Sequence, residues 1–262
     1  MPSFEPKEEK IPVTSLADER RSPHITRVTG KSRLYRVLDH KVPSVTSVLS
    51  TVYPKPALVG WAKKISREAY GSYLEDHMGE PITPDIIAKG MESAKGAEKD
   101  TTARDYGTTV HELISRDVQG KRIEVASEFA DTIEAWREWR SLFKLKLIDS
   151  EVAVYLIGGA QHMRYAGTVD LIFKRPNGRY LISDIKTSKA VYPEALLQLV
   201  AYAGALKWLA PHPIEVDMEV LRLGKDKKNK PEFEVVSVTN AAKLWETWAA
   251  ALRFHYEYEG EQ

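Results

Sequence analysis

The sequence predicts an α/β protein in which a mainly helical N-terminal part precedes a strand-rich C-terminal part. Up to about residue 145 the apolar residues recur at helical spacing, whereas later segments alternate as strands do. The expected strands lie at 151–157, 165–174, 179–187, 215–223 and 232–238. A helix at about 192–209 separates the third strand from the fourth. Strands that flank one crossing helix are typical of an α/β core.

The chain divides further by composition. Residues 1–24 are rich in proline and charge, and we expect them to be flexible. Residues 25–262 are expected to form a single domain, with a mainly helical part at 25–147 and the α/β core at 148–262. Ser44 is a predicted helix N-cap, and a short strand or hairpin is expected near residues 34–37. Further helices are expected near 83–95, 97–119, 126–145 and 240–257.

The helix expected at 126–145 shows the clearest helical periodicity. Its apolar stripe consists of Phe129, Ile133, Trp136 and Leu142. We expect this stripe to face the core.

Composition excludes several classes of protein. The chain has 262 residues, of which 43% are hydrophobic, and a net charge of +1, so binding of a polyanion requires a local basic patch. It has no cysteine, which rules out disulfides, thiolate zinc sites and an iron–sulfur cluster. Any metal site must therefore use carboxylates or imidazoles, which favours a hard divalent ion. No segment is apolar over the ~18–20 residues that a membrane helix needs, and the N-terminus lacks a signal-peptide pattern. We expect a cytoplasmic protein without membrane contact.

The second and third strands carry an unusual pair of carboxylates. The loop that joins them ends in Gly178, which suits the positive φ of a three-residue hairpin loop. Counting back from this loop sets Asp170 directly opposite Asp184, with Cβ atoms roughly 5 Å apart. Strand alternation places Lys186 on the same face as Asp184. Solvent, a raised pKa or a bound cation would each relieve the repulsion, so a solvated edge with a stray ion pair and a metal site both remain open.

The order of four short motifs then becomes informative. The pattern D170-(x13)-D184-I-K186 resembles the PD-(D/E)XK nuclease signature. The downstream 198-QLVAY-202 and the upstream 107-GTTVH-111 resemble the Q-x-x-x-Y and helical His motifs of the RecB-like exonuclease branch. The region 43-PSVTSVL…KPALVGWAKK-64 is similar to N-terminal segments of phage-encoded and mitochondrial members of that branch. The resemblance implies a restriction-endonuclease-like core, with a central mixed β-sheet flanked by helices and a helical N-terminal part.

The resemblance also implies a metal site. Asp170 and Asp184 would ligate Mg²⁺ or Mn²⁺, assisted by the backbone carbonyl of Ile185. His111 would complete the site or bind a second ion, although a single histidine is also a common core or surface residue. Glu151, which opens the first strand, either adds a further ligand or is a solvated strand start.

Other residues acquire expected roles in the same way. Lys186 would orient or deprotonate the attacking water. Gln198 and Tyr202 lie four apart on a helix and would either hold the nucleic-acid backbone or contact the site behind Lys186; a buried structural pair is the alternative. Thr187 is expected to contact phosphate.

Two basic patches are candidates for contact with DNA. Lys227 and Lys228 belong to the most basic cluster, 225-KDKKNK-230, which either reaches a phosphate backbone or is a solvated loop. Lys63 and Lys64 flank Trp61 on a predicted helix. Trp61 could stack on an unpaired base, but core packing is the usual role of tryptophan.

The function that the resemblance implies is a Mg²⁺- or Mn²⁺-dependent DNA exonuclease that favours single-stranded ends. It would act in recombination, repair or replication, with proteins of those processes as partners, in a bacterial or phage-infected cell. The alternatives are a structure-specific endonuclease with the same site and a non-catalytic DNA-binding module. The intact set of Asp170, Asp184 and Lys186 disfavours the non-catalytic module.

Overall fold

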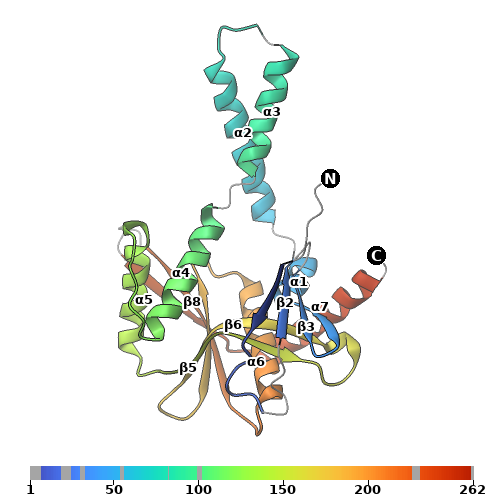
Figure 1. Cartoon of the computed structure of the whole chain (residues 1–262), viewed down its shortest axis with the longest axis vertical. Coiled ribbons are helices and arrows are strands. Elements are labelled where there is room, and N and C mark those ends of the chain that lie inside the picture. The colour runs from blue at the N-terminus through green and yellow to red at the C-terminus, as the bar shows by residue number, and fades with distance from the viewer. Residues whose placement is uncertain are drawn as a thin grey trace. The chain divides into compact units, whose positions relative to one another are not determined.

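A mixed five-stranded sheet organises the C-terminal half of the chain (Figure 1). Its strands are β5 (Lys146–Leu156), β6 (Tyr165–Lys174), β7 (Tyr180–Lys186), β8 (Val216–Lys225) and β9 (Pro231–Ser237), in that spatial order. Neighbouring strands are antiparallel except β7 and β8, which are parallel and joined through helix α6 (Pro193–Leu209). The predicted α/β class is confirmed, and the first strand begins at Lys146 rather than at residue 151.

The structure is a computed structural model, and it describes residues 7–18, 25–29, 33–53, 56–81, 83–98, 102–225 and 231–260. The chain separates into two compact units. The sheet unit comprises Met1–Tyr53 and Thr109–Gln262, and the hairpin unit comprises Pro54–Thr108. The boundary expected at residue 147 does not divide the units, because the helices that follow Thr109 belong with the sheet.

Helices cover both faces of the five-stranded sheet. On one face, Ile172, Ile182 and Val220 are buried with the apolar residues of α6 in the main core. On the other face, helix α5 (Ala130–Leu142) packs Trp139 against Phe173, with ring centroids 5.8 Å apart. Because both faces are covered, the end of β7 lies inside the protein and not along an open edge.

The apolar stripe of the α5 region is only partly as predicted. A 3₁₀ turn (Ser127–Phe129) precedes α5, and Phe129, Ile133 and Trp136 are buried as expected. The prediction for Leu142 is wrong, because its side chain is 63% exposed at the end of the helix. Trp139 takes its place, since it lies three residues after Trp136 and therefore on the same helix face.

A second sheet precedes these elements. It is antiparallel and contains β1 (Lys7–Ile11), β2 (Ile25–Thr29), β3 (Arg33–Val37) and β4 (His40–Pro43). Only the strand near 34–37 was expected, and the flexibility assigned to residues 1–24 does not hold for β1. Glu8, Glu9 and Lys10 of β1 are exposed, Glu9 pairs with Arg27 and Glu8 with Arg36, and Ile11 is buried. Cross-strand ion pairs thus account for a composition that otherwise suggests disorder.

The remaining helices fall close to their expected positions. They are α1 (Val45–Val52), α2 (Pro56–Asp76), α3 (Pro84–Glu98), α4 (Thr102–Val118) and α7 (Ala241–Gly260). Ser44 caps α1 as predicted, because its side chain accepts a hydrogen bond from the Ser47 N–H at 2.9 Å. None of the helices in the described ranges is long and apolar enough to cross a membrane.

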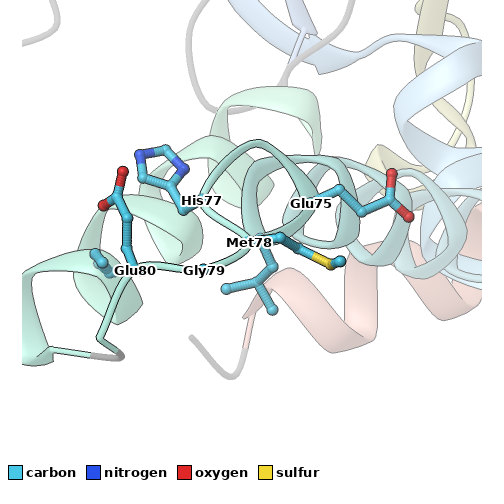
Figure 2. Close-up of a pocket in the computed structure, with 7 residues that line it drawn as sticks. Glu75, His77, Met78, Gly79 and Glu80 are labelled. Carbon is cyan, nitrogen blue, oxygen red and sulfur yellow. The ribbon is translucent and has the colours of Figure 1, made fainter.

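The hairpin unit consists mainly of α2 and α3. The two helices approach closely at Gly90, where a Cβ atom would lie 2.8 Å from the ring of Tyr70. A hollow of about 340 Å³ lies at the turn between them, and Figure 2 shows His77, Met78 and Glu80 around it. No predicted site residue lines this hollow.

Helix α4 is anchored at its C-terminal end by Asp117. The carboxylate accepts hydrogen bonds from the Trp136 indole N–H at 2.8 Å and from the Arg137 guanidinium at 2.9 Å. Arg140 donates to the backbone carbonyls of Asp117 and Val118, which satisfies the last turn of the helix. Burial raises the pKa of Asp117, but the Trp136 and arginine donors outweigh it and hold this pKa below its usual range.

We predict that Asp117→Asn destabilises the protein by about 1 kcal/mol, since the charge is lost while the shape remains and the arginines are partly exposed. Because the folded-state pKa is lowered, this contribution is present above the unfolded-state pKa of about 4 and is lost as pH falls below it. Thermal melting of both proteins between pH 3 and pH 7 measures the difference. Glu134→Gln, an exposed substitution on α5, is the control, and an equal loss of stability in this variant would contradict the stabilising role of the Asp117 carboxylate.

Candidate active site

The hairpin of β6 and β7 has the predicted register. Its pairs run from Lys174↔Tyr180 to Leu171↔Ser183, and the next position in this register sets Asp170 opposite Asp184. The loop closes as expected, because Gly178 has a φ of 83° and its N–H donates to the carbonyl of Arg175 at 3.0 Å. The local pattern therefore determines which carboxylates meet.

The two strands part at this carboxylate pair. Beyond Leu171↔Ser183 the ladder stops, and the N–H of Ile185 donates to Asp170 Oδ2 at 2.8 Å. A side-chain carboxylate thus replaces the backbone acceptor that the ladder would have supplied. This contact fixes Asp170 and leaves its Oδ1 free to face other elements. The predicted role of the Ile185 carbonyl in metal binding stays a prediction.

Asp184 lies in the interior. It is 1% exposed, so the solvated-edge alternative is wrong for this residue. Gln198 Nε2 donates to Asp184 Oδ1 at 2.9 Å, and Lys186 Nζ lies 2.5 Å from Oδ2. Burial raises the pKa of Asp184 to about 6, although the Lys186 ammonium acts in the opposite direction. Burial would lower the pKa of Lys186, but Asp184 and Asp170 outweigh it and raise this pKa, so Lys186 is an ammonium at neutral pH.

A second group of side chains converges on the other oxygen of Asp170. His111 Nδ1, on α4, lies 3.4 Å from Asp170 Oδ1 and 3.8 Å from Glu151 Oε1, on β5. One ligand atom from each of these three residues lies within 4.8 Å of the others. Burial opposes protonation of His111, but the two carboxylates outweigh it and raise the pKa of His111 to about 10.

This donor set fits a divalent metal ion. An imidazole nitrogen and two carboxylate oxygens suit ions such as Mn²⁺ and Mg²⁺, and the two acids supply the negative charge that a dication offsets. Of the predicted ligands, the structure brings together His111, Asp170 and Glu151. Asp184 faces Lys186 and Gln198, and its predicted role as a metal ligand stays a prediction.

Glu151 occupies a strained position. Its φ is 52°, in the left-handed region that residues with a side chain rarely adopt, at a cost of order 1–3 kcal/mol. It falls in β5 between Ser150, paired with Leu171, and Val152, paired with Val169, and therefore lies opposite Asp170. An irregularity between Leu147 and Asp149 bends the strand just before it. Strain of this kind persists only where neighbouring contacts enforce it.

Two sets of hydrogen bonds hold the residues that precede Glu151. Asp149 Oδ2 accepts from the Thr14 hydroxyl at 2.6 Å and from the Ser15 N–H at 2.9 Å. Ser150 Oγ accepts from Gln119 Nε2 at 2.7 Å and lies 3.1 Å from Ser115 Oγ. Both anchors act through side chains distant in sequence.

The Ser150 contacts also locate helix α4. Ser115 and Gln119 follow His111 at intervals of four residues, so all three lie along one face of α4. The bonds to Ser150 therefore set the separation between His111 and Glu151. Sequence reasoning missed these polar residues, and their spacing after His111 was the signal that could have identified them.

Gln198 and Tyr202 form a unit behind Asp184. Gln198 Nε2 donates both to Asp184 Oδ1 and to Tyr202 Oη, each at 2.9 Å. Tyr202 is 3% exposed, and a Cβ atom on Gly167 would lie 2.3 Å from its ring, so only glycine permits this packing. Gln198 contacts the site through Asp184, and its bond to Tyr202 also fits the alternative of a buried structural pair, so the role of the two residues stays a prediction.

The nucleic-acid contacts predicted for the other residues stay predictions. Thr187 is half-buried directly after β7. Lys64 is exposed on α2 and pairs with Glu68 at 3.6 Å. Trp61 and Lys63 lie on α2, but their side chains are outside the described part of the structure, as are Lys227 and Lys228 entirely.

Comparisons with known proteins identify the family. A sequence model described as the PD-(D/E)XK nuclease superfamily matches residues 118–258, more than half of the chain. The chain belongs to this superfamily. The matched region includes Asp170, Asp184 and Lys186 and begins after His111. The expected nuclease core with a mixed sheet and flanking helices is thereby confirmed.

Solved structures show only distant similarity. A candidate exonuclease from Eubacterium rectale is 14% identical, with a TM-score of 0.40 and coverage of 64% of this chain and 71% of that chain. An alkaline exonuclease from Laribacter hongkongensis is 14% identical, with a TM-score of 0.32 and coverage of 62% and 84%, respectively. The same enzyme in complex with dAMP is 12% identical, with a TM-score of 0.31 and coverage of 75% and 93%. A search among curated proteins finds no match.

We predict that Glu151→Gln weakens Mn²⁺ binding at least tenfold in calorimetric titration, since one charged ligand is lost. Ser150→Ala should weaken Mn²⁺ binding about tenfold, because outer contacts that orient ligands typically contribute this much. Glu134→Gln is the control for charge alone. Wild-type affinity in both site variants would contradict this ligand set.

Proposed function

We propose that this protein is a Mg²⁺- or Mn²⁺-dependent deoxyribonuclease that hydrolyses phosphodiester bonds from DNA ends, with a preference for single-stranded ends. The observation that carries the proposal is the convergence of His111, Glu151 and Asp170 beside the buried pair of Asp184 and Lys186. Membership of a nuclease superfamily supports this chemistry.

The residues divide the work between metal binding and charge stabilisation. His111, Glu151 and Asp170 would hold the divalent ion, which supplies a Lewis acid and a water of lowered pKa. Lys186 presents an ammonium on the same face of the β6–β7 hairpin as Asp170. There it would stabilise negative charge that develops on the phosphate. The carboxylates of Asp184 and Asp170 raise the pKa of Lys186, which favours the ammonium form that orients the water and stabilises charge; deprotonation of the water by Lys186 is the alternative.

Asp184, Gln198 and Tyr202 position this ammonium. Asp184 holds Lys186 at 2.5 Å, and Gln198 fixes the other oxygen of Asp184 while bonding to the buried Tyr202 hydroxyl. Such a chain of contacts keeps a long, flexible lysine in one place, which lowers the entropy lost when a substrate binds.

Exonuclease activity is supported by the order of the motifs. His111, the Asp170–Asp184–Lys186 set and Gln198-x-x-x-Tyr202 follow one another as in the RecB-like exonuclease branch that the sequence resembles. A role in recombination, repair or replication, with the proteins of those processes, in a bacterial or phage-infected cell belongs to the same proposal.

We expect end-labelled linear DNA to be degraded in Mg²⁺ or Mn²⁺, single strands faster than duplexes, with closed circles intact and EDTA abolishing the activity. Gel analysis of labelled strands measures this. Cutting of closed circles would instead indicate an endonuclease. Metal-independent binding without cleavage in any metal would indicate a non-catalytic module.

We predict that Lys186→Ala lowers cleavage about 100-fold or more, because removal of one charge that stabilises the transition state has effects of this size. DNA affinity measured with Ca²⁺ should stay close to that of the wild type. Lys207→Ala, an exposed lysine at the end of α6, is the matched control. Substantial residual cleavage by the Lys186 variant would contradict its role.

A further inference from the structure

A cavity of about 450 Å³ lies directly downstream of the catalytic strand in the sheet unit. Its lining includes residues 189–193, which connect the end of β7 to the start of α6, together with Leu196 and two residues of β9. Lys189 follows Lys186 by three residues, so their Cα atoms are at most about 11 Å apart.

The cavity has an apolar floor and a charged rim. Val191, Leu196 and Val236 are partly buried and pack against the main core on their inner side. Lys189 contributes an exposed ammonium at the rim. The acidic rim residue, Glu234, accepts a hydrogen bond from Arg222 Nε at 2.6 Å, so its charge is offset within the protein. Arg222 also lies 3.9 Å from Glu232, so Lys189 is the cation of this lining and Glu234 is its anion.

Tyr192 is the aromatic wall of this cavity. Its side chain is 46% exposed and lines the cavity. The backbone is fixed, because Pro193 follows and the Tyr192 carbonyl accepts from the Ala195 N–H at 3.0 Å. A fixed backbone beneath an exposed ring lets it contact a flat ligand with little loss of conformational entropy.

We propose that this cavity binds an unpaired nucleobase of the DNA strand held at the metal site, with Tyr192 as the stacking surface and Lys189 as a phosphate contact. The inference rests on the proposed function, whose substrate it specifies. Base stacking on an aromatic ring and a nearby cation are the two elements that single-strand binding sites combine. The volume lies within the range of small-ligand sites.

The proposal gives a physical reason for preferring single strands. A base in a duplex is already stacked and paired, so it would have to leave the helix at a cost of a few kcal/mol before it could reach Tyr192. A base at a single-stranded end incurs little of this cost. The cavity therefore discriminates by the pairing state of the nucleotide and not by its sequence, since every base has a stacking face.

The test compares Tyr192→Ala, Tyr192→Phe and Tyr258→Ala with the wild type. Tyr258, on α7, is also 46% exposed and serves as the matched control for removal of a surface ring. Affinity for a single-stranded oligonucleotide is measured in EDTA by fluorescence anisotropy. We expect Tyr192→Ala to weaken it about tenfold, with Tyr192→Phe and Tyr258→Ala close to wild type.

An abasic scan then locates the base. Oligonucleotides with one abasic position at successive distances from the end should bind the wild type more weakly at one position, and Tyr192→Ala should lose that dependence. Equal affinity of Tyr192→Ala and wild type, or an equal loss in Tyr258→Ala, would overturn the proposal.

Failure of the cavity and failure of the proposed function are separable. Wild-type cleavage with no effect of Tyr192→Ala on binding would reject the cavity alone. Tyr192-dependent binding without cleavage in any metal would reject the nuclease function and retain the base site.

Discussion

The contacts of one carboxylate, Asp170, determine the geometry of the whole site. One of its oxygens accepts the N–H of Ile185 where the ladder between β6 and β7 has ended, and the other faces His111 on α4. Because Asp170 joins a strand end to a helix, its two contacts bring the metal-binding group and the Asp184–Lys186 pair to a common point. The parting of β6 and β7 is thus the structural event on which the chemistry depends.

The surroundings of Asp170 show how the protein sustains an unfavourable arrangement. Three acids and a lysine converge, and Glu151 adopts a left-handed backbone conformation within a strand. Hydrogen bonds to Asp149 and Ser150 hold this conformation by anchoring the two residues that precede Glu151. The strained backbone and the converging charges at the site disfavour the folded state. Contacts elsewhere, such as the hydrogen bonds of Asp117 at the end of α4, favour it. Sites that concentrate charge commonly show this division.

Helix α4 connects these two regions. Its last turn is fixed to α5 through Asp117, and its Ser115–Gln119 face is fixed to β5 through Ser150. His111 lies on the same helix, one turn before Ser115. The position of the imidazole is therefore set by contacts on two sides of the helix.

The sequence by itself determined the features that depend on nearby residues. A loop ending in Gly178 and a period of two residues are enough to set Asp170 opposite Asp184 and to align Lys186, and a period of 3.6 residues places Gln198 beside Tyr202. The helices and strands of the C-terminal half followed from the same periodicities. Local geometry decides these relations, so tertiary structure does not alter them.

The tertiary structure decided the rest. It showed that Glu151, a solvated strand start in one interpretation, joins His111 and Asp170, while Asp184 faces Lys186 and Gln198. It also placed β1 in a sheet and exposed Leu142 in favour of Trp139. Each of these outcomes depends on which distant segments pack together, and periodicity along one segment carries no information about its partner. The sequence thus offered Asp170, Asp184, His111 and Glu151 as candidate ligands, and the tertiary structure decided which of them lie together around Asp170.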